Sequence, residues 1–337
     1  MQTLSALEFL QAKSSSAASY ATTIIDVRSP SEFAHSHIPN AINLAVLDDE
    51  ERARVGTLYR HNPFEAKLLG AGLICQNIAS FLPTFLSNLG LTPAHIIRIY
   101  CARGGMRSLS LQTILHNIGY RTIRLQGGYK AYRNAVLTDL ARTPNMQFFT
   151  LVGPTGSGKS ELLALYEYAL DIESLAKHCG SSFGAIYGTQ PSVAMFENML
   201  FTRLGELEGK KVLVEGESKK LGNLIVPKAL YNAYQSAPKI YLHTPIELRI
   251  QRILGYYQHI SEEFFVNAMQ KIAPFMQKNF WLEAKEAFMR DDKYMVAQIL
   301  LEHYYDKVYK KEVYAYRIES SNLHDALDSI RDIMARH

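Results

Sequence analysis

The sequence predicts an α/β protein with two parallel β-sheets, each covered by helices, and a helical C-terminal region. Three observations indicate this fold class. Short β-branched runs alternate with segments of helical periodicity, which is the order of elements in parallel sheets. Two such runs lead directly into glycine-rich turns, at Tyr100–Ser108 and Gly153–Ser160. Between them, the polar, proline-containing stretch Thr138–Met146 predicts a linker, so we expect domains over residues 1–140 and 141–337.

The first half contains a regular succession of strands and helices. Thr23–Val27 predicts a strand. The next helix begins with a capping box, in which Ser29 is the N-cap, Pro30 takes the first helical position and Glu32 closes the box. Residues 48–89 predict a helical insertion, with Cys75 packed in its apolar part. The other predicted elements are strands at Ala41–Leu44, Ile96–Ile99 and Thr122–Leu125 and a helix at Ser108–Ile118.

The loop after Ile96–Ile99 contains a candidate nucleophile, Cys101. Its glycines let successive backbone amides turn inward and form a concave anion site. The start of the following helix and the guanidinium of Arg107 add positive potential at the same place. Because this field stabilises a thiolate, we expect Cys101 to be reactive. The predicted anion-binding loop comprises Arg103, Gly104, Gly105, Met106, Arg107 and Ser108.

In the second half, the strand Phe148–Val152 leads into GPTGSGKS, which matches G-x-x-x-x-G-K-S and is followed by a helical pattern over residues 161–170. Strand, loop and helix are the context that a P-loop requires. Its amides surround a phosphate, its lysine neutralises the charge and its serine reaches a magnesium ion. The predicted phosphate-binding residues are Gly153, Thr155, Gly156, Ser157, Gly158, Lys159 and Ser160.

The strand Lys211–Val214 ends at two acids, Glu215 and Glu217, which are candidates for orienting magnesium or contacting a diphosphate. The alternative is that both are exposed loop acids. A further strand, Lys239–Leu242, precedes a helix with Arg249 and Arg252, which either close over phosphates or lie on a solvated face.

From Ser261 to the end we expect mainly helix. Aromatic residues there permit either base stacking or ordinary helix packing. They are Phe280, Trp281, Tyr304 and Tyr305. The lysines that we expect to contact RNA are Lys219, Lys220, Lys310 and Lys311.

Composition limits the function classes. The 337 residues carry a formal net charge of +4, which permits a polyanionic partner without requiring one. The N-terminus lacks the pattern of a signal peptide, and no uninterrupted apolar run approaches a membrane span. We therefore expect a cytoplasmic protein without a membrane partner. The three cysteines form no C-x-x-C pair, which argues against a disulfide framework or a cysteine-based zinc site.

The first half resembles a rhodanese domain. The resemblance rests on DVRSPSEFAHSHIPNAINL, YCARGGMRS and LQGGYKAYR and covers about residues 5–136. Rhodaneses commonly carry C-x-x-x-x-R in the loop, whereas Cys101 and Arg107 enclose one residue more, as in rhodanese-like phosphatases. The larger ring implies, as a hypothesis, that the loop holds a tetrahedral phosphate-type anion. Stronger protection of Cys101 by thiosulfate than by phosphate would contradict that hypothesis.

The order of blocks along the whole chain resembles the tRNA 2-selenouridine synthase family. The blocks are DVRSPSEF, VGTLY at 55–59, YCARGGMRS, LQGGYKAYR, GPTGSGKS, GSSFG at 180–184 and VEGESKKLGN at 214–223. One position differs from the family pattern: Cys179 stands directly before GSSFG, where we expect the family to carry a basic residue.

This resemblance implies an enzyme that converts wobble 2-thiouridine of tRNA to 2-selenouridine. The implied co-substrates are selenophosphate and geranyl diphosphate, of which the second gives an S-geranyl intermediate. We expect Mg²⁺ as a cofactor and no tightly bound organic cofactor. The resemblance makes Cys101 the essential residue of selenation. The alternative functions are a sulfurtransferase coupled to an ATPase or kinase domain and a nucleotide-gated binding module with an inactive loop.

Overall fold

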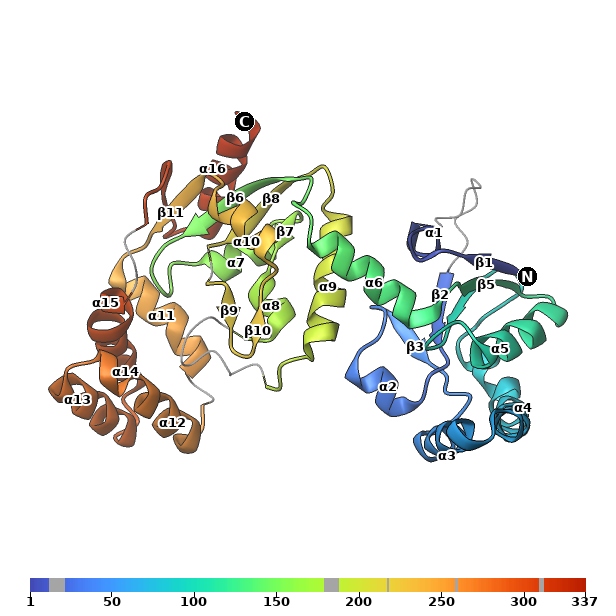
Figure 1. The fold of residues 1–337 in the computed structure, drawn as a ribbon. Coiled ribbons are helices and arrows are strands. Elements are labelled where there is room, and N and C mark those ends of the chain that lie inside the picture. The colour runs from blue at the N-terminus through green and yellow to red at the C-terminus, as the bar shows by residue number, and fades with distance from the viewer. Residues whose placement is uncertain (12–21, 179–187, 217, 258–259, 309–311) are drawn as a thin grey trace. The chain divides into compact units, whose positions relative to one another are not determined.

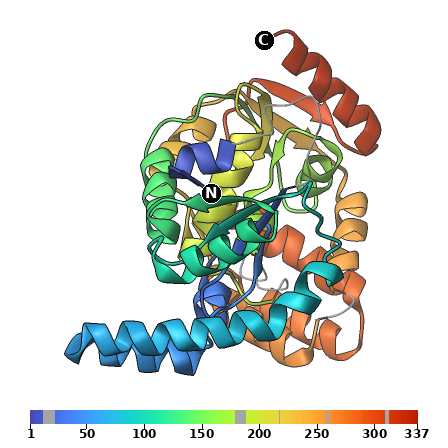
Figure 2. The same cartoon turned by 90° about the vertical axis from the view of Figure 1, so that its right-hand side faces the viewer.

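The computed structural model describes residues 1–11, 22–178, 188–216, 218–257, 260–308 and 312–337. The chain divides into two compact units (Figure 1), and Figure 2 shows the same fold turned by 90°. Unit 1 comprises Met1–Asp139 and Ser192–Thr202, and unit 2 comprises Leu140–Pro191 and Arg203–His337. Each unit has its own five-stranded parallel sheet with helices around it, which confirms the predicted α/β fold class. Residues 192–202 lie within the range predicted for the second domain, yet belong to unit 1.

The sheet of unit 1 has the strand order β1-β5-β4-β2-β3, and all neighbouring strands are parallel. Strand β4 is buried over almost its whole length, as expected for a central strand with helices on both faces. Ile97 and Ile99 of β4 belong to a core that also includes Ile74 of α4 and Leu111 of α5. The strands are β1 (Gln2–Leu4), β2 (Thr22–Asp26), β3 (Ala41–Asn43), β4 (Ile96–Tyr100) and β5 (Arg121–Leu125). The helices are α1 (Ala6–Gln11), α2 (Pro30–His35), α3 (Asp49–His61), α4 (Pro63–Asn88), α5 (Met106–Asn117), α6 (Gly128–Leu140) and α9 (Val193–Glu206), of which the last continues into unit 2.

Helices α3 and α4 form the predicted helical insertion and pack along each other. The chain turns between them at Asn62. On α4, Ile74 is buried whereas Cys75 is exposed, so the predicted burial of Cys75 was wrong. Consecutive residues of a helix point about 100° apart, and burial of Ile74 therefore turns Cys75 outward. The expectation that no segment approaches a membrane span is corrected here: Pro63–Phe85 is long and apolar enough to cross a membrane, by length and composition only, and 17% of its most apolar 18 residues are buried.

The sheet of unit 2 has the strand order β12-β11-β6-β8-β7, again with parallel neighbours throughout. The P-loop strand β6 is thus central, between β11 and β8. The strands are β6 (Gln147–Val152), β7 (Ala169–Leu170), β8 (Lys211–Glu215), β11 (Lys239–His243) and β12 (Tyr316–Glu319), with an antiparallel pair β9 (Lys220–Leu221) and β10 (Leu224–Ile225) beside them. The α-helices packed around this sheet are α7 (Lys159–Leu165), α8 (Ile172–Ala176), α10 (Lys228–Gln235), α11 (Ile246–Tyr257) and α16 (Leu323–Ala335).

Two features of unit 2 differ from the sequence-based expectation. Helix α7 ends at Leu165, and Ala169–Leu170 forms the short strand β7 instead of continuing the helix. Strand β12 lies in the region predicted to be helical. It has four residues, of which only Ile318 is fully buried, so its alternation is too short to stand out among the surrounding helical patterns.

The helices between α11 and β12 have a hydrophobic core of their own. The rings of Phe265 and Phe288 stack in it, with centroids 3.9 Å apart. These elements are α12 (Glu262–Ile272), a 3₁₀ turn (Ala273–Phe275), α13 (Lys278–Met289), α14 (Lys293–Leu300), a π-helical turn (Leu301–Tyr305) and α15 (Asp306–Val308). This confirms the predicted helical C-terminal region apart from β12.

Candidate functional site

Cys101 lies directly after the central strand β4, at the carboxyl end of the parallel sheet. The loop that follows ends where α5 begins at Met106. Two backbone amides at the start of α6 donate hydrogen bonds to this loop. Tyr129 N donates to Cys101 O at 2.8 Å, and Lys130 N donates to Ala102 O at 3.0 Å. Only 3% of Cys101 is exposed, so its thiol is enclosed by the loop.

The thiol contacts a hydroxyl from α5. Cys101 Sγ lies 3.2 Å from Ser108 Oγ, which is also 3.2 Å from Gly105 O. The hydroxyl has one proton, which it donates either to the carbonyl or to the sulfur. When the thiol is ionised, the second orientation provides a hydrogen bond to the thiolate. The predicted nucleophile and Ser108 are therefore brought together by the structure.

The arginines of the loop have different environments. Arg103 is exposed, whereas Arg107 is mostly buried and donates from Nη1 to Glu32 at 2.7 Å. Glu32 also pairs with Arg52 of α3, with 3.4 Å between Arg52 Nε and the carboxylate. Burial alone would raise the pKa of Glu32, but the hydrogen bond and charge of Arg107, with further contributions from Ser29 and Arg52, hold it below its usual value.

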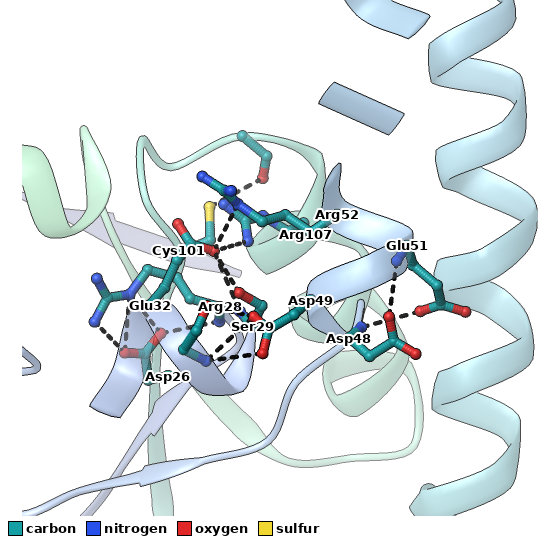
Figure 3. A network of polar contacts seen from close by, with 12 residues as sticks. Asp26, Arg28, Ser29, Glu32, Asp48, Asp49, Glu51, Arg52, Cys101 and Arg107 are labelled. Atoms are coloured by element: carbon teal, nitrogen blue, oxygen red, sulfur yellow. Dashed lines mark hydrogen bonds and ion pairs between the residues drawn. The ribbon is translucent and has the colours of Figure 1, made fainter. Parts of the chain in front are cut away.

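Glu32 and Arg52 were missed as site residues. The sequence assigned Glu32 to the capping box of α2, and it does accept hydrogen bonds there from Ser29 N and Ser29 Oγ at 3.2 and 3.3 Å. Its second contact, with Arg107, joins residues that lie 75 positions apart in the sequence. No local sequence pattern predicts such a contact. Figure 3 shows Glu32, Arg52 and Arg107 around Cys101.

In unit 2, Lys159 begins α7 and is 9% exposed. Its ammonium donates to Gly153 O at 2.9 Å and to Pro154 O at 3.3 Å, and it pairs with Glu215 Oε1 at 3.4 Å. The strand β6, the loop and α7 therefore have the arrangement predicted for a P-loop. Ser160 follows Lys159 in the first turn and is partly exposed.

The two arginines of α11 support the P-loop from outside instead of facing solvent. Arg249 Nε donates to Thr155 O at 2.8 Å, and the same guanidinium forms a two-point ion pair with Asp306. Arg252 donates to Gly156 O at 3.3 Å and to Ser320 O at 2.7 Å. The solvated-face alternative is therefore wrong for both arginines, because their guanidinium groups bond to carbonyls of the loop itself.

Close packing also explains one glycine of the P-loop. Gly156 has a φ of +79°, and a Cβ atom there would lie 2.9 Å from Arg249 O and 3.2 Å from Arg249 Cα. Both atoms belong to the backbone of α11, so a larger residue would push this helix away from the loop. This glycine is therefore required by packing as well as by backbone conformation.

Glu215 ends β8 and is buried, which excludes an exposed loop acid at this position; Glu217 lies outside the described residues. A further acid, Asp171, precedes α8. Burial raises the pKa of Asp171 and the charge of Glu215 acts in the same direction, whereas the amide of Ser174 opposes the shift. Within the described residues, no group of three or more His, Cys, Asp and Glu side chains could hold a metal ion. The hydroxyl of Ser160 and the carboxylate of Glu215 are the oxygen donors that Mg²⁺ prefers.

The predicted RNA-contacting residues have different outcomes. Lys219 and Lys220 are exposed, and Lys310, Lys311, Cys179 and the block at 180–184 lie outside the described residues. The aromatic residues serve helix packing: Tyr304 and Tyr305 belong to the core of the helical region, Phe280 and Trp281 pack against it, and the Trp281 indole donates to Met269 O at 2.8 Å. Because Tyr304 and Tyr305 are buried, helix packing describes these two side chains, whereas Phe280 and Trp281 are only partly buried.

Two family profiles match the chain: a rhodanese-like domain over residues 6–135, and the AAA domain of tRNA 2-selenouridine synthase over residues 146–290. The chain is 35% identical over 258 residues to the tRNA 2-selenouridine synthase of Shewanella loihica, covering 75% of this chain and 69% of that protein. It is 37% identical over 259 residues to that of Shewanella denitrificans, covering 74% and 69%. A solved rhodanese-like domain protein from Staphylococcus aureus is 21% identical, with a TM-score of 0.25, and covers 39% of this chain and 91% of its own. The two Shewanella relatives show that the chain belongs to the tRNA 2-selenouridine synthase family.

Proposed function

We propose that this protein converts 2-thiouridine at the wobble position of tRNA to 2-selenouridine. Family membership supports the reaction, and the enclosed thiol of Cys101 in a loop with Arg103 and Arg107 supports a site for an anionic donor. A second phosphate site in the P-loop supports a second anionic substrate. An enzyme with two such sites fits a reaction that takes two phosphorus compounds.

The first step is alkylation of the thiouridine sulfur by geranyl diphosphate. The sulfur forms a bond to C1 of the geranyl group, the C–O bond breaks and diphosphate leaves. The P-loop amides and Lys159 bind the diphosphate, and its charge takes the place of the carbonyls that Lys159 now contacts. Ser160 and the phosphate oxygens would hold Mg²⁺, which neutralises the leaving group.

The second step replaces the geranylated sulfur with selenium. The selenium of selenophosphate attacks C2 of the base and geranylthiol leaves, since alkylation has made the sulfur a better leaving group. Water then cleaves the P–Se bond and releases phosphate. Cys101 either carries the selenium covalently or orients the donor. Cys101→Ser distinguishes these roles, because retained selenation excludes covalent carriage.

The test is to incubate the purified protein with tRNA containing 2-thiouridine, geranyl diphosphate and selenophosphate, and to weigh the nucleosides after digestion. A geranylated nucleoside without selenophosphate, and a selenated one with it, are the expected products. Lys159→Ala should abolish the first product. An unchanged nucleoside with well-folded protein, together with ATP hydrolysis that Lys159→Ala abolishes, would instead establish the sulfurtransferase coupled to an ATPase.

A further inference from the structure

We propose that Arg52, from the helical insertion, is a ligand of the anion that binds at Cys101, and that Glu32 is its counter-ion while the site is empty. This inference rests on the proposed anion site in the Cys101 loop. It adds to the site a residue that lies outside the loop and has no motif of its own.

The position of Arg52 is determined by how α3 is attached to the sheet domain. Asp49 accepts hydrogen bonds from Ser31 N at 3.2 Å and from Ser31 Oγ at 2.5 Å, which ties the first turn of α3 to α2. On the other side, Asn77 of α4 donates to Glu51 at 2.7 Å. Because both sides of this turn are held, Arg52 is positioned at Glu32, which also pairs with Arg107 of the Cys101 loop (Figure 3).

The two arginines bonded to Glu32 differ in their freedom to move. Arg107 makes a 2.7 Å contact and its side chain is 18% exposed, whereas Arg52 makes a 3.4 Å contact and is 51% exposed. A half-exposed, longer ion pair contributes little to stability and breaks readily. An incoming oxyanion would therefore take Arg52 from Glu32 and leave the Glu32–Arg107 pair intact.

The charges around the thiol favour a multiply charged ligand. Arg52 of α3 and Arg107 of the loop share the carboxylate of Glu32, and Arg103 of the loop is exposed. The charge of Arg52 also acts on Asp49. A guanidinium binds two oxygens of a tetrahedral oxyanion at once, which a lysine ammonium does not do. The ligand class is thus a phosphate-type dianion, such as selenophosphate.

The experiment measures how inorganic phosphate protects Cys101 from iodoacetamide, with each cysteine quantified by peptide mass spectrometry. Cys75, which is exposed, is the internal reference for reagent strength. We expect Arg52→Ala to raise the half-protecting phosphate concentration about fivefold to tenfold, as for the loss of a charge-assisted hydrogen bond. Arg52→Lys should recover part of this loss. Arg54→Ala, an exposed arginine on the same helix, is the matched control and should behave as the unmodified protein.

A second variant tests the role of Glu32 with the opposite sign. Glu32→Gln keeps a side-chain oxygen for the capping box but removes the counter-charge of both arginines. It should lower the half-protecting phosphate concentration, and it should lower it less when Arg52→Ala is already present, a coupling that a purely structural Arg52 would not produce. In the selenation assay, Arg52→Ala should raise KM for selenophosphate more than it lowers kcat.

The outcomes separate this inference from the proposed function. Protection that is equal in the unmodified protein and in Arg52→Ala overturns the role of Arg52 but leaves the anion site standing. A complete lack of phosphate protection in the unmodified protein overturns both.

Discussion

The sulfur of Cys101 and the hydroxyl oxygen of Ser108 lie 3.2 Å apart, one from the end of β4 and the other from the first turn of α5. The hydroxyl is buried, so water does not compete for this contact. A hydrogen bond to a charged group is worth about 1.5–3 kcal/mol, so this contact favours a sulfur that carries negative charge.

Ser108→Ala should therefore slow the alkylation of Cys101 by iodoacetamide at pH 7 by about tenfold, since the thiolate loses a donor. Peptide mass spectrometry measures the rate. Ser110→Ala is the matched control on the same helix, because the Ser110 hydroxyl donates to the carbonyl of Met106 at 3.0 Å. Equal rates for Ser108→Ala and Ser110→Ala would show that the hydroxyl does not act on the sulfur.

Gly128→Ala should disrupt the Cys101 loop. Gly128 has a φ of +60°, and a Cβ atom there would lie 2.3 Å from Cys101 O. We expect a loss of more than about 3 kcal/mol in the free energy of unfolding, because overlap adds to backbone strain. Gly119 also has a positive φ, +102°, but a Cβ atom there would meet nothing within 4 Å. Gly119→Ala should cost only about 1 kcal/mol. Similar losses in chemical denaturation would contradict the packing explanation.

Lys159 and Glu215 should be strongly coupled. Their side chains are 10% and 9% exposed, so removal of one takes the opposite charge of this ion pair away from a buried group. Lys159→Met should lower the free energy of unfolding by about 3 kcal/mol, and Glu215→Gln added to it should restore much of that loss. A double-mutant cycle in urea measures the coupling. The exposed pair Arg331–Asp328 is the control, with a coupling expected below about 0.5 kcal/mol.

Asp171→Asn should stabilise the protein at neutral pH. Burial raises the pKa of Asp171, with Glu215 acting in the same direction against the amide of Ser174, so the folded state binds this proton more tightly than the unfolded state. The ionised carboxylate therefore costs stability above the folded pKa, and the cost disappears below the unfolded pKa. Asparagine stays neutral and can still accept from Ser174 N, as Asp171 does at 2.8 Å.

The measurement for Asp171→Asn is the unfolding midpoint from pH 7 down to pH 3. The gain over the unmodified protein should be largest at pH 7 and should shrink as the carboxyl becomes protonated. Asp292→Asn, at the exposed N-cap of α14, is the matched control and should show little change. A gain in the unfolding midpoint that does not vary with pH would show that the ionisation of Asp171 is not its cause.

Much of the fold and part of the candidate site were predictable because their signals are local. The P-loop, the Cys101 loop and the α2 capping box each occupy a few consecutive residues, and hydrophobic periodicity indicated most of the helices and strands. Strand β12 was not predicted because four residues are too few to show a clear periodicity. The burial of Cys75 was wrongly predicted because an apolar helix has exposed positions that its composition does not reveal.

By itself, the sequence determined which groups are present and how the chain turns around them: the thiol after a strand, the phosphate loop before a helix, and the α/β order of elements. The tertiary structure alone decided which charges meet. Arg107 and Arg52 both form ion pairs with Glu32. Arg249 and Arg252 donate hydrogen bonds to carbonyls of the P-loop. Asp171 lies close enough to Glu215 for the charge of Glu215 to act on it. The physical reason is that electrostatic interactions depend on distance in space, and parallel strands bring to one sheet edge residues that lie far apart along the chain.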